Sequence, residues 1–208
     1  MTVVGAPWHD RDVTDFGTTL LVVGSEAMLV GRRVEERVRS AREARPAAEI
    51  VDLSPADVAE GRFVEAVGGS LFASESIVVV RDISALPPEQ MDLVVRTAQH
   101  PGEAVCLTLT HPGGVKGKAL LDRLGKAGVP RVTVESVKVN DLPRFVMDEA
   151  KRARVRLDLP VATALVEAVG TDLAALSSAV TQLGDDWPGA TLTVETSCPS
   201  FVRTSTTR

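Results

Sequence analysis

A run of four β-branched residues, Ile77 to Val80, constrains the fold of this chain more than any other feature. A strand with one solvated face alternates apolar and polar side chains, so an unbroken apolar run predicts a strand buried on both faces, as in a parallel sheet covered by helices. Just before this run, Leu71 and Phe72 stand among small residues in the sequence GGSLFAS. Such neighbours are too small to shelter the pair within the loop. Either the fold covers these two side chains, as core residues at the entrance of the strand, or a partner does.

The order of the expected elements predicts an α/β fold. Apolar runs typical of strands alternate with segments of helical spacing, and strands that alternate with helices form a parallel sheet. Ser54 and Pro55 are typical of a helix N-cap and first helical position. The expected strands cover residues 18–23, 48–53, 77–80, 104–110 and 130–135, and the longer helices cover 26–45, 87–99 and 117–126.

The pattern changes after Ser136, because three segments of helical spacing follow and no convincing strand precedes residue 190. We expect Asp158 and Pro160 to start the second of these helices, and Thr171 to cap the third. The sequence therefore predicts two domains between two irregular ends. These parts are an N-terminal arm at 1–16, an α/β domain at 17–138, a small helical domain at 139–195, and a polar, disordered tail at 196–208.

Composition excludes several classes of function. The net charge is −5, with 23 basic and 28 acidic residues, which argues against autonomous binding of nucleic acid. Aromatic residues make up only 3% of the chain, too few for a platform that stacks bases. We expect Cys106 to be a buried small hydrophobe, and the two cysteines have neither disulfide nor zinc spacing. With no signal peptide and no apolar run of membrane-spanning length, we expect a cytoplasmic protein without membrane contact.

A phosphate-binding loop needs glycines that allow close backbone approach, a lysine for the outer phosphates and a hydroxyl for magnesium. The turn after the first strand, residues 24–32 (GSEAMLVGR), has no lysine and places Glu26 where the phosphates would lie. The turn after the fourth strand, residues 111–119 (HPGGVKGKA), has the right context, but Pro112 and Ala119 replace the first glycine and the hydroxyl. We therefore interpret this chain as a nucleotide-binding architecture without its chemistry, and expect no cofactor.

Residues typical of other catalytic sites are present but show no catalytic pattern. His9, His100 and His111 fall in expected loops without the spacing of metal ligands. Cys106 has no electropositive neighbours in sequence that would activate it. The sequence indicates no catalytic residues and no metal site.

Several segments, taken in order, carry a resemblance to a known family. They are residues 21–26 (LVVGSE), the SLF sequence of Ser70, Leu71 and Phe72 before a valine strand that ends in Arg81 and Asp82, then 111–118 (HPGGVKGK), 142–146 (LPRFV) and 170–173 (GTDL). Together they resemble the delta-subunit family of bacterial DNA polymerase III, the clamp-opening subunits of the sliding-clamp loader. The likeness covers about residues 18–195. It implies an AAA+-like (RecA-like) parallel sheet with flanking helices, followed by a small all-α lid domain. Family members resemble AAA+ ATPase modules that have lost nucleotide binding.

The resemblance implies a role for the Leu-Phe pair. In the family a plug at this position inserts into an apolar pocket of the ring-shaped clamp, and the match places that plug on Leu71 and Phe72, beside Ser70. Gly68 and Gly69 stand where family members can carry a further bulky residue, so the contact here is expected to be smaller. The implied partners are the sliding clamp (the beta subunit), the other loader subunits and, within the assembled complex only, primer–template DNA.

The resemblance also bears on activity. It implies a non-catalytic subunit of a DNA-directed DNA polymerase (nucleotidyltransferase) complex that acts in DNA replication, with neither ATPase nor polymerase activity of its own. Family members carry a third helical domain that forms the oligomeric collar. The resemblance ends before such a domain, so we expect a chain without a collar.

Two alternatives stay open on the residues alone. A degenerate P-loop ATPase would use Lys116 and Lys118. A DNA-binding module would use the arginines of the first long helix, although the interleaved Glu35 and Glu36 favour a salt-bridged, solvated face. The arginines in question are Arg32, Arg33, Arg37 and Arg39.

Overall fold

The computed structural model describes residues 15–68, 75–187 and the backbone of 191–192. The chain divides into two compact units, the first ending at Glu135 and the second beginning at Ser136, whereas the sequence had placed the boundary after residue 138. Most of the N-terminal arm, the tail and the SLF segment lie outside the described residues.

The first unit is built on a parallel sheet of five strands in the order β2-β3-β4-β1-β5. The strands are β1 (Thr18–Val23), β2 (Glu49–Leu53), β3 (Ser76–Val80), β4 (Val105–His111) and β5 (Arg131–Thr133). Every residue of β3 and β4 is buried, because these strands lie inside the sheet and helices cover both faces. This confirms the strand that the β-branched run predicted.

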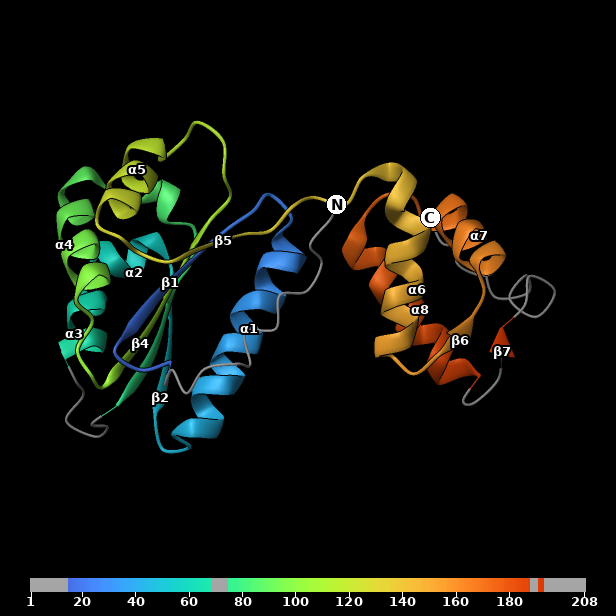
Figure 1. The fold of residues 1–208 in the computed structure, drawn as a ribbon, viewed down its shortest axis with the longest axis horizontal. Helices are drawn as coiled ribbons and strands as arrows, with labels where there is room; N and C mark the ends of the chain where they lie inside the picture. The colour runs from blue at the N-terminus through green and yellow to red at the C-terminus, as the bar shows by residue number, and fades with distance from the viewer. Residues whose placement is uncertain (1–14, 69–74, 188–190, 193–208) are drawn as a thin grey trace. The chain divides into compact units, whose positions relative to one another are not determined.

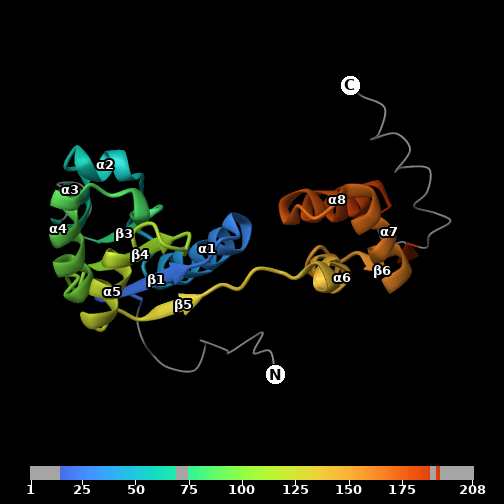
Figure 2. The ribbon, with the colours of Figure 1, turned by 90° about the horizontal axis from the view of Figure 1, so that it is seen from above.

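Helices of unequal number cover the two faces of this sheet (Figures 1 and 2). Four helices pack on one face, where Phe63, Val94 and Leu120 join the main core. The other face is covered by α1 (Ala27–Ala44), which packs through Ala41 against Ile77 and Cys106. The helices of the first face are α2 (Pro55–Ala59), α3 (Arg62–Gly68), α4 (Pro88–Gln99) and α5 (Lys118–Lys126).

Two predicted positions in this unit need comment. Ser54 caps α2 as expected, in a capping box in which its side chain and that of Asp57 each accept from the other's backbone N–H. Ala27, which the helical spacing of residues 26–45 places on the apolar stripe of α1, is exposed. The buried stripe consists of Val30, Val34 and Ala41.

The second unit packs three helices around their apolar faces: α6 (Leu142–Arg152), α7 (Leu159–Val169) and α8 (Leu173–Asp186). Val146, Leu165 and Leu176 are among the buried residues. Asp158 caps α7 as predicted. The cap of α8 is Asp172, whose side chain accepts from the Ala175 N–H at 2.9 Å, so the prediction that Thr171 caps this helix is wrong.

A small strand pair in this unit corrects a further prediction. β6 (Arg156–Leu157) pairs in parallel with β7 (Thr191–Leu192), although no strand was expected before residue 190. Strands of two residues are too short to show the alternation by which a sequence indicates a strand. Within the part of the chain that the structure describes, no helix has the length and apolarity needed to cross a membrane.

Candidate interaction site

The predicted plug, Ser70, Leu71 and Phe72, falls within residues 69–74 and so outside the described residues. The structure does describe the two elements to which this segment is attached. On one side, α3 ends at Gly68. On the other side, Glu75 leads into β3, which begins at Ser76. The attachment of both flanks can therefore be examined.

The flank formed by α3 is fixed to the core of the first unit. Phe63 is fully buried there, and Ala66 and Val67 pack against the same cluster. At the start of the helix, Arg62 forms an ion pair with Asp57 of α2. Because burial of a phenylalanine side chain contributes about 1.5–3 kcal/mol, this short helix is held by the sheet rather than by its own propensity.

The flank formed by β3 is held by both backbone and side chain. Glu75 accepts from the Glu49 N–H at 3.0 Å, and its carboxylate pairs with Arg45 at 2.7 Å. The Ser76 N–H donates to the carbonyl oxygen of Ala104 at 2.9 Å. The Ser76 Oγ donates to the carbonyl oxygen of Ala66 at 2.8 Å and thereby joins the two flanks. The segment between them starts and ends on one rigid part of the molecule.

These flanks lie at the amino end of β3, whereas the two turns that could form a nucleotide site follow the carboxyl ends of β1 and β4 (Figure 1). In open α/β sheets, ligands bind outside the carboxyl ends of the strands. The predicted plug is therefore attached at the amino ends of the parallel strands, and the candidate nucleotide turns lie at the opposite, carboxyl ends.

The β1–α1 turn has only three residues, Gly24 to Glu26. A Cβ atom on Gly24 would lie 2.7 Å from the carbonyl oxygen of Val134, so the backbone of the turn is packed against the chain beyond β5. Glu26 stands at the N-cap of α1 without a side-chain hydrogen bond to the helix. A turn this short does not provide the glycine-rich loop that surrounds phosphates in P-loop proteins.

The β4–α5 turn is longer and closes on itself. Gly113, Gly114 and Gly117 all have positive φ, and the Lys118 N–H donates to the carbonyl oxygen of Val115 at 3.2 Å. Lys116 and Lys118 are exposed. A Cβ atom on Gly117 would lie 2.7 Å from both His111 Nε2 and the Ser84 Cα. The turn is thus folded over buried groups instead of surrounding an open cradle.

His111 was expected in a loop, and this is wrong: it ends β4 and is buried. Its Nδ1 accepts from the Gly113 N–H at 2.8 Å, while Nε2 has no hydrogen-bond partner within the described ranges. Burial lowers the pKa of His111, and the nearby Asp82 carboxylate opposes that shift in part. The signal in the sequence was the apolar run AVCLTLT, which continues by one residue into His111.

Other candidate groups are structural in their surroundings. Cys106 is buried, as predicted, and burial raises the pKa of its thiol, which makes the thiol a poor nucleophile. Among the described residues, no group of three or more His, Cys, Asp or Glu side chains could hold a metal ion.

The arginines proposed for DNA binding do not form one basic face. Arg33 pairs with Glu36 at 2.9 Å. Arg37 is largely buried and donates to the backbone carbonyl of Asp15 and to Thr18. Arg32 also has an interaction. Of the four arginines, Arg39 is thus the exposed one without a hydrogen bond or ion pair to the described residues, so α1 does not present the basic footprint that such a module needs.

Comparison with solved structures gives the fold. The clamp loader delta protein (YqeN) of Bacillus subtilis superposes with a TM-score of 0.60 at 14% identity, over 87% of this chain and 57% of that protein. The chain has the fold of a clamp-loader delta protein. Two variants of the RuvB protein of Thermotoga maritima have TM-scores of 0.53 and 0.51 at 11% and 12% identity, over 81% of this chain and 54% and 55% of theirs.

These matches confirm the AAA+-like α/β fold and, at the level of the fold, the resemblance found in the sequence. This chain spans a little over half the length of the proteins it superposes on. No family model matches the sequence, and no curated protein matches it.

Proposed function

We propose that this chain is a non-catalytic subunit of a sliding-clamp loader, which binds the DNA sliding clamp and opens it during replication by the DNA polymerase III holoenzyme. The observation that carries this proposal is the fold shared with the Bacillus subtilis clamp loader delta protein over 87% of the chain. The β1–α1 turn supports a non-catalytic role, because its three residues are too few to form a phosphate-binding loop. ATP would then act through other loader subunits, in the cytoplasm, with primer–template DNA held by the assembled complex.

The proposed contact with the clamp is the plug of Leu71 and Phe72, beside Ser70. Insertion of both side chains into an apolar pocket would contribute about 1.5–3 kcal/mol each, and an aromatic–aliphatic anchor is a common form of interface hot spot. The anchored flanks support this role: a force on the segment passes to α3 and β3 and from there to the sheet. Opening follows if the bound chain prefers the distorted clamp and shifts its population.

The test is a titration of the purified chain with its cognate sliding clamp, with and without ATP. The Leu71→Ala/Phe72→Ala double variant should bind on the order of a hundredfold more weakly or worse, since each 1.4 kcal/mol is a tenfold change in affinity. Leu159→Ala is the matched control, because Leu159 is an exposed apolar side chain of the second unit. Unchanged affinity of a folded double variant would contradict the plug.

Two further readouts test the rest of the proposal. A pair of fluorophores across the subunit interface of the clamp should report separation when the chain binds, and the separation should not require ATP. If instead the chain binds ATP, and Lys118→Ala abolishes that binding, the alternative of a degenerate P-loop ATPase replaces the non-catalytic role.

A further inference from the structure

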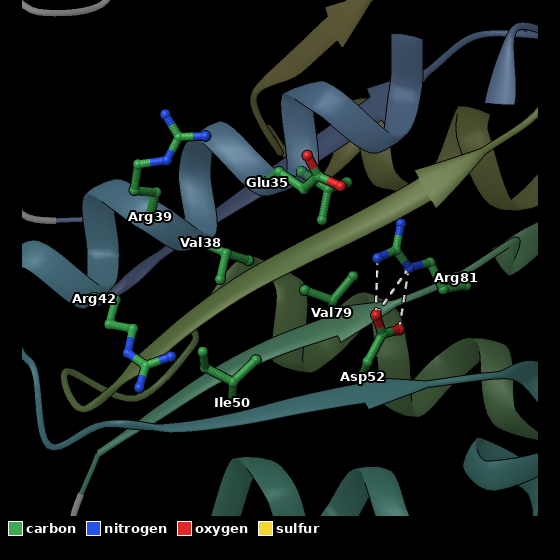
Figure 3. Close-up of a pocket in the computed structure, with 9 residues that line it drawn as sticks. Glu35, Val38, Arg39, Arg42, Ile50, Asp52, Val79 and Arg81 are labelled. Atoms are coloured by element: carbon green, nitrogen blue, oxygen red, sulfur yellow. Dashed lines mark hydrogen bonds and ion pairs between the residues drawn. The ribbon is translucent and has the colours of Figure 1, made fainter. Parts of the chain in front are cut away.

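A groove of about 400 Å³ lies on the α1 side of the sheet, between this helix, the edge strand β2 and its neighbour β3 (Figure 3). Among the described residues, α1 is the helix that covers this face of the sheet, and it leaves the outermost strand, β2, partly uncovered. Ile50 of β2 is 41% exposed, which is unusual for an isoleucine within a sheet. The lining residues are Val34, Glu35, Val38, Arg39, Arg42, Ile50, Asp52, Val79 and Arg81.

Of the arginines that line this groove, one is paired with a carboxylate of the described chain and two are not. At one end, Arg81 makes hydrogen bonds of 2.8–3.1 Å to both carboxylate oxygens of Asp52. Arg39 and Arg42, on the C-terminal half of α1, have no recorded hydrogen bond or ion pair with the part of the chain that the structure describes. Figure 3 shows Arg42 on the side of the helix that faces Ile50. The other end of the groove therefore combines two unpaired cations with an exposed apolar side chain.

The backbone of β2 adds a third feature to the same place. β2 is an edge strand, paired only with β3 in the described sheet. The Glu49 N–H donates to Glu75 and the Leu53 carbonyl accepts from Arg81, so in this parallel ladder Glu49, Val51 and Leu53 bond towards β3. The N–H and C=O groups of Ile50 and Asp52 then point to the open edge. Ile50 and Asp52 also line the groove, so a strand added to this edge would place alternate side chains on it.

We propose that this groove receives an extended, acidic segment of another protein, which adds to the edge of β2 and alternates apolar with acidic residues. Its apolar side chains would cover Ile50, and its carboxylates would pair with Arg39 and Arg42. The proposal does not rest on clamp binding, because its residues belong to α1 and β2 and lie outside the proposed plug. Charge complementarity and the unpaired backbone edge select the class of partner.

The test uses the full chain and a fluorescein-labelled peptide of four Glu-Val repeats, with binding followed by fluorescence anisotropy. Arg39→Glu/Arg42→Glu should weaken binding at least tenfold, whereas the matched control Arg144→Glu/Arg156→Glu, which reverses two exposed charges of the second unit, should not. Ile50→Pro should also weaken binding at least tenfold. It removes the outward N–H and the exposed isoleucine side chain but no bond to β3, and edge strands tolerate proline at such a position.

Amide hydrogen exchange gives a readout specific to strand addition, because the amides of Ile50 and Asp52 should become protected when the peptide binds. Failure of the peptide to bind, or binding that survives all three groove substitutions, would overturn the proposal. Binding of a ten-nucleotide oligo(dT) that depends on Arg39 and Arg42, in place of the peptide, would overturn it in favour of a nucleic-acid groove. Binding that appears only after removal of residues 1–14 would assign the groove to the chain's own N-terminal segment.

Discussion

The Oγ atom of Ser76 donates a hydrogen bond of 2.8 Å to the carbonyl oxygen of Ala66. These two residues stand on either side of residues 69–74, so the bond joins the last turn of α3 to the first residue of β3. Ser76 is buried, and water does not replace the bond readily if it is lost. The flanks of the proposed plug are thereby coupled to each other as well as to the core.

Removal of this bond should destabilise the first unit. We expect Ser76→Ala to lower the free energy of unfolding by about 1 kcal/mol, the usual net contribution of one hydrogen bond. Urea denaturation followed by far-ultraviolet circular dichroism measures it, with Ser136→Ala, at an exposed serine, as the control. Equal midpoints for the two variants would show that the bond does not contribute.

Substitution of Gly117 should be costly for two reasons. Its φ of +72° is unfavourable for any residue with a side chain, and the new Cβ atom would meet His111 and Ser84. We expect Gly117→Ala to lower the free energy of unfolding by about 2 kcal/mol or more. Gly31 lies within α1 with nothing near its Cβ position, so Gly31→Ala should raise the free energy of unfolding by about 0.5–1 kcal/mol. Thermal melts of both variants should therefore move in opposite directions.

The two candidate caps of α8 can be separated by substitution. Asp172→Ala should cost about 1 kcal/mol, because it removes the side chain that accepts from the Ala175 N–H. Thr171→Ala should have almost no effect, since the structure gives Thr171 no capping role. Native-state hydrogen exchange of the Ala175 amide is the most direct measurement. Faster exchange in the Thr171 variant than in the Asp172 variant would contradict the assignment.

Protonation of His111 should destabilise the folded chain. Burial lowers the pKa of His111 in the folded state below the ordinary value near 6.5. The unfolded state therefore binds the proton more readily, and the stability that the neutral imidazole confers is present above about pH 6.5 and lost as the pH falls towards the lower folded pKa.

The pH dependence can be measured as the free energy of unfolding between about pH 7.5 and about pH 5, a range that spans the ordinary histidine pKa. The His111→Asn variant keeps an acceptor for the Gly113 N–H but does not titrate, so its stability should fall less over this range than that of the unmodified chain. Parallel curves for the two proteins would exclude His111 as the source of the slope.

Local patterns in the sequence were sufficient for most of the first unit. The β-branched run at Ile77–Val80 predicted a strand buried on both faces, and Ser54 with Pro55 predicted the start of α2. Both are confirmed, because each depends on properties of a few adjacent residues. The prediction failed at Thr171, where the neighbouring Asp172 is an equally good cap by composition, and at β6, where two residues carry no periodicity.

The sequence by itself determined the α/β class, the approximate strand and helix ranges, the missing phosphate loop and the burial of Cys106. Only the tertiary structure decided that His111 is covered by its own turn, that the two flanks of residues 69–74 are joined through Ser76, and that Arg39 and Arg42 line a groove beside the exposed Ile50. Strands and caps follow from short-range pattern and propensity. Each of these three relationships joins residues of different elements or of an element and its turn, so the packing of the sheet, its helices and its turns decides them, and no local pattern does.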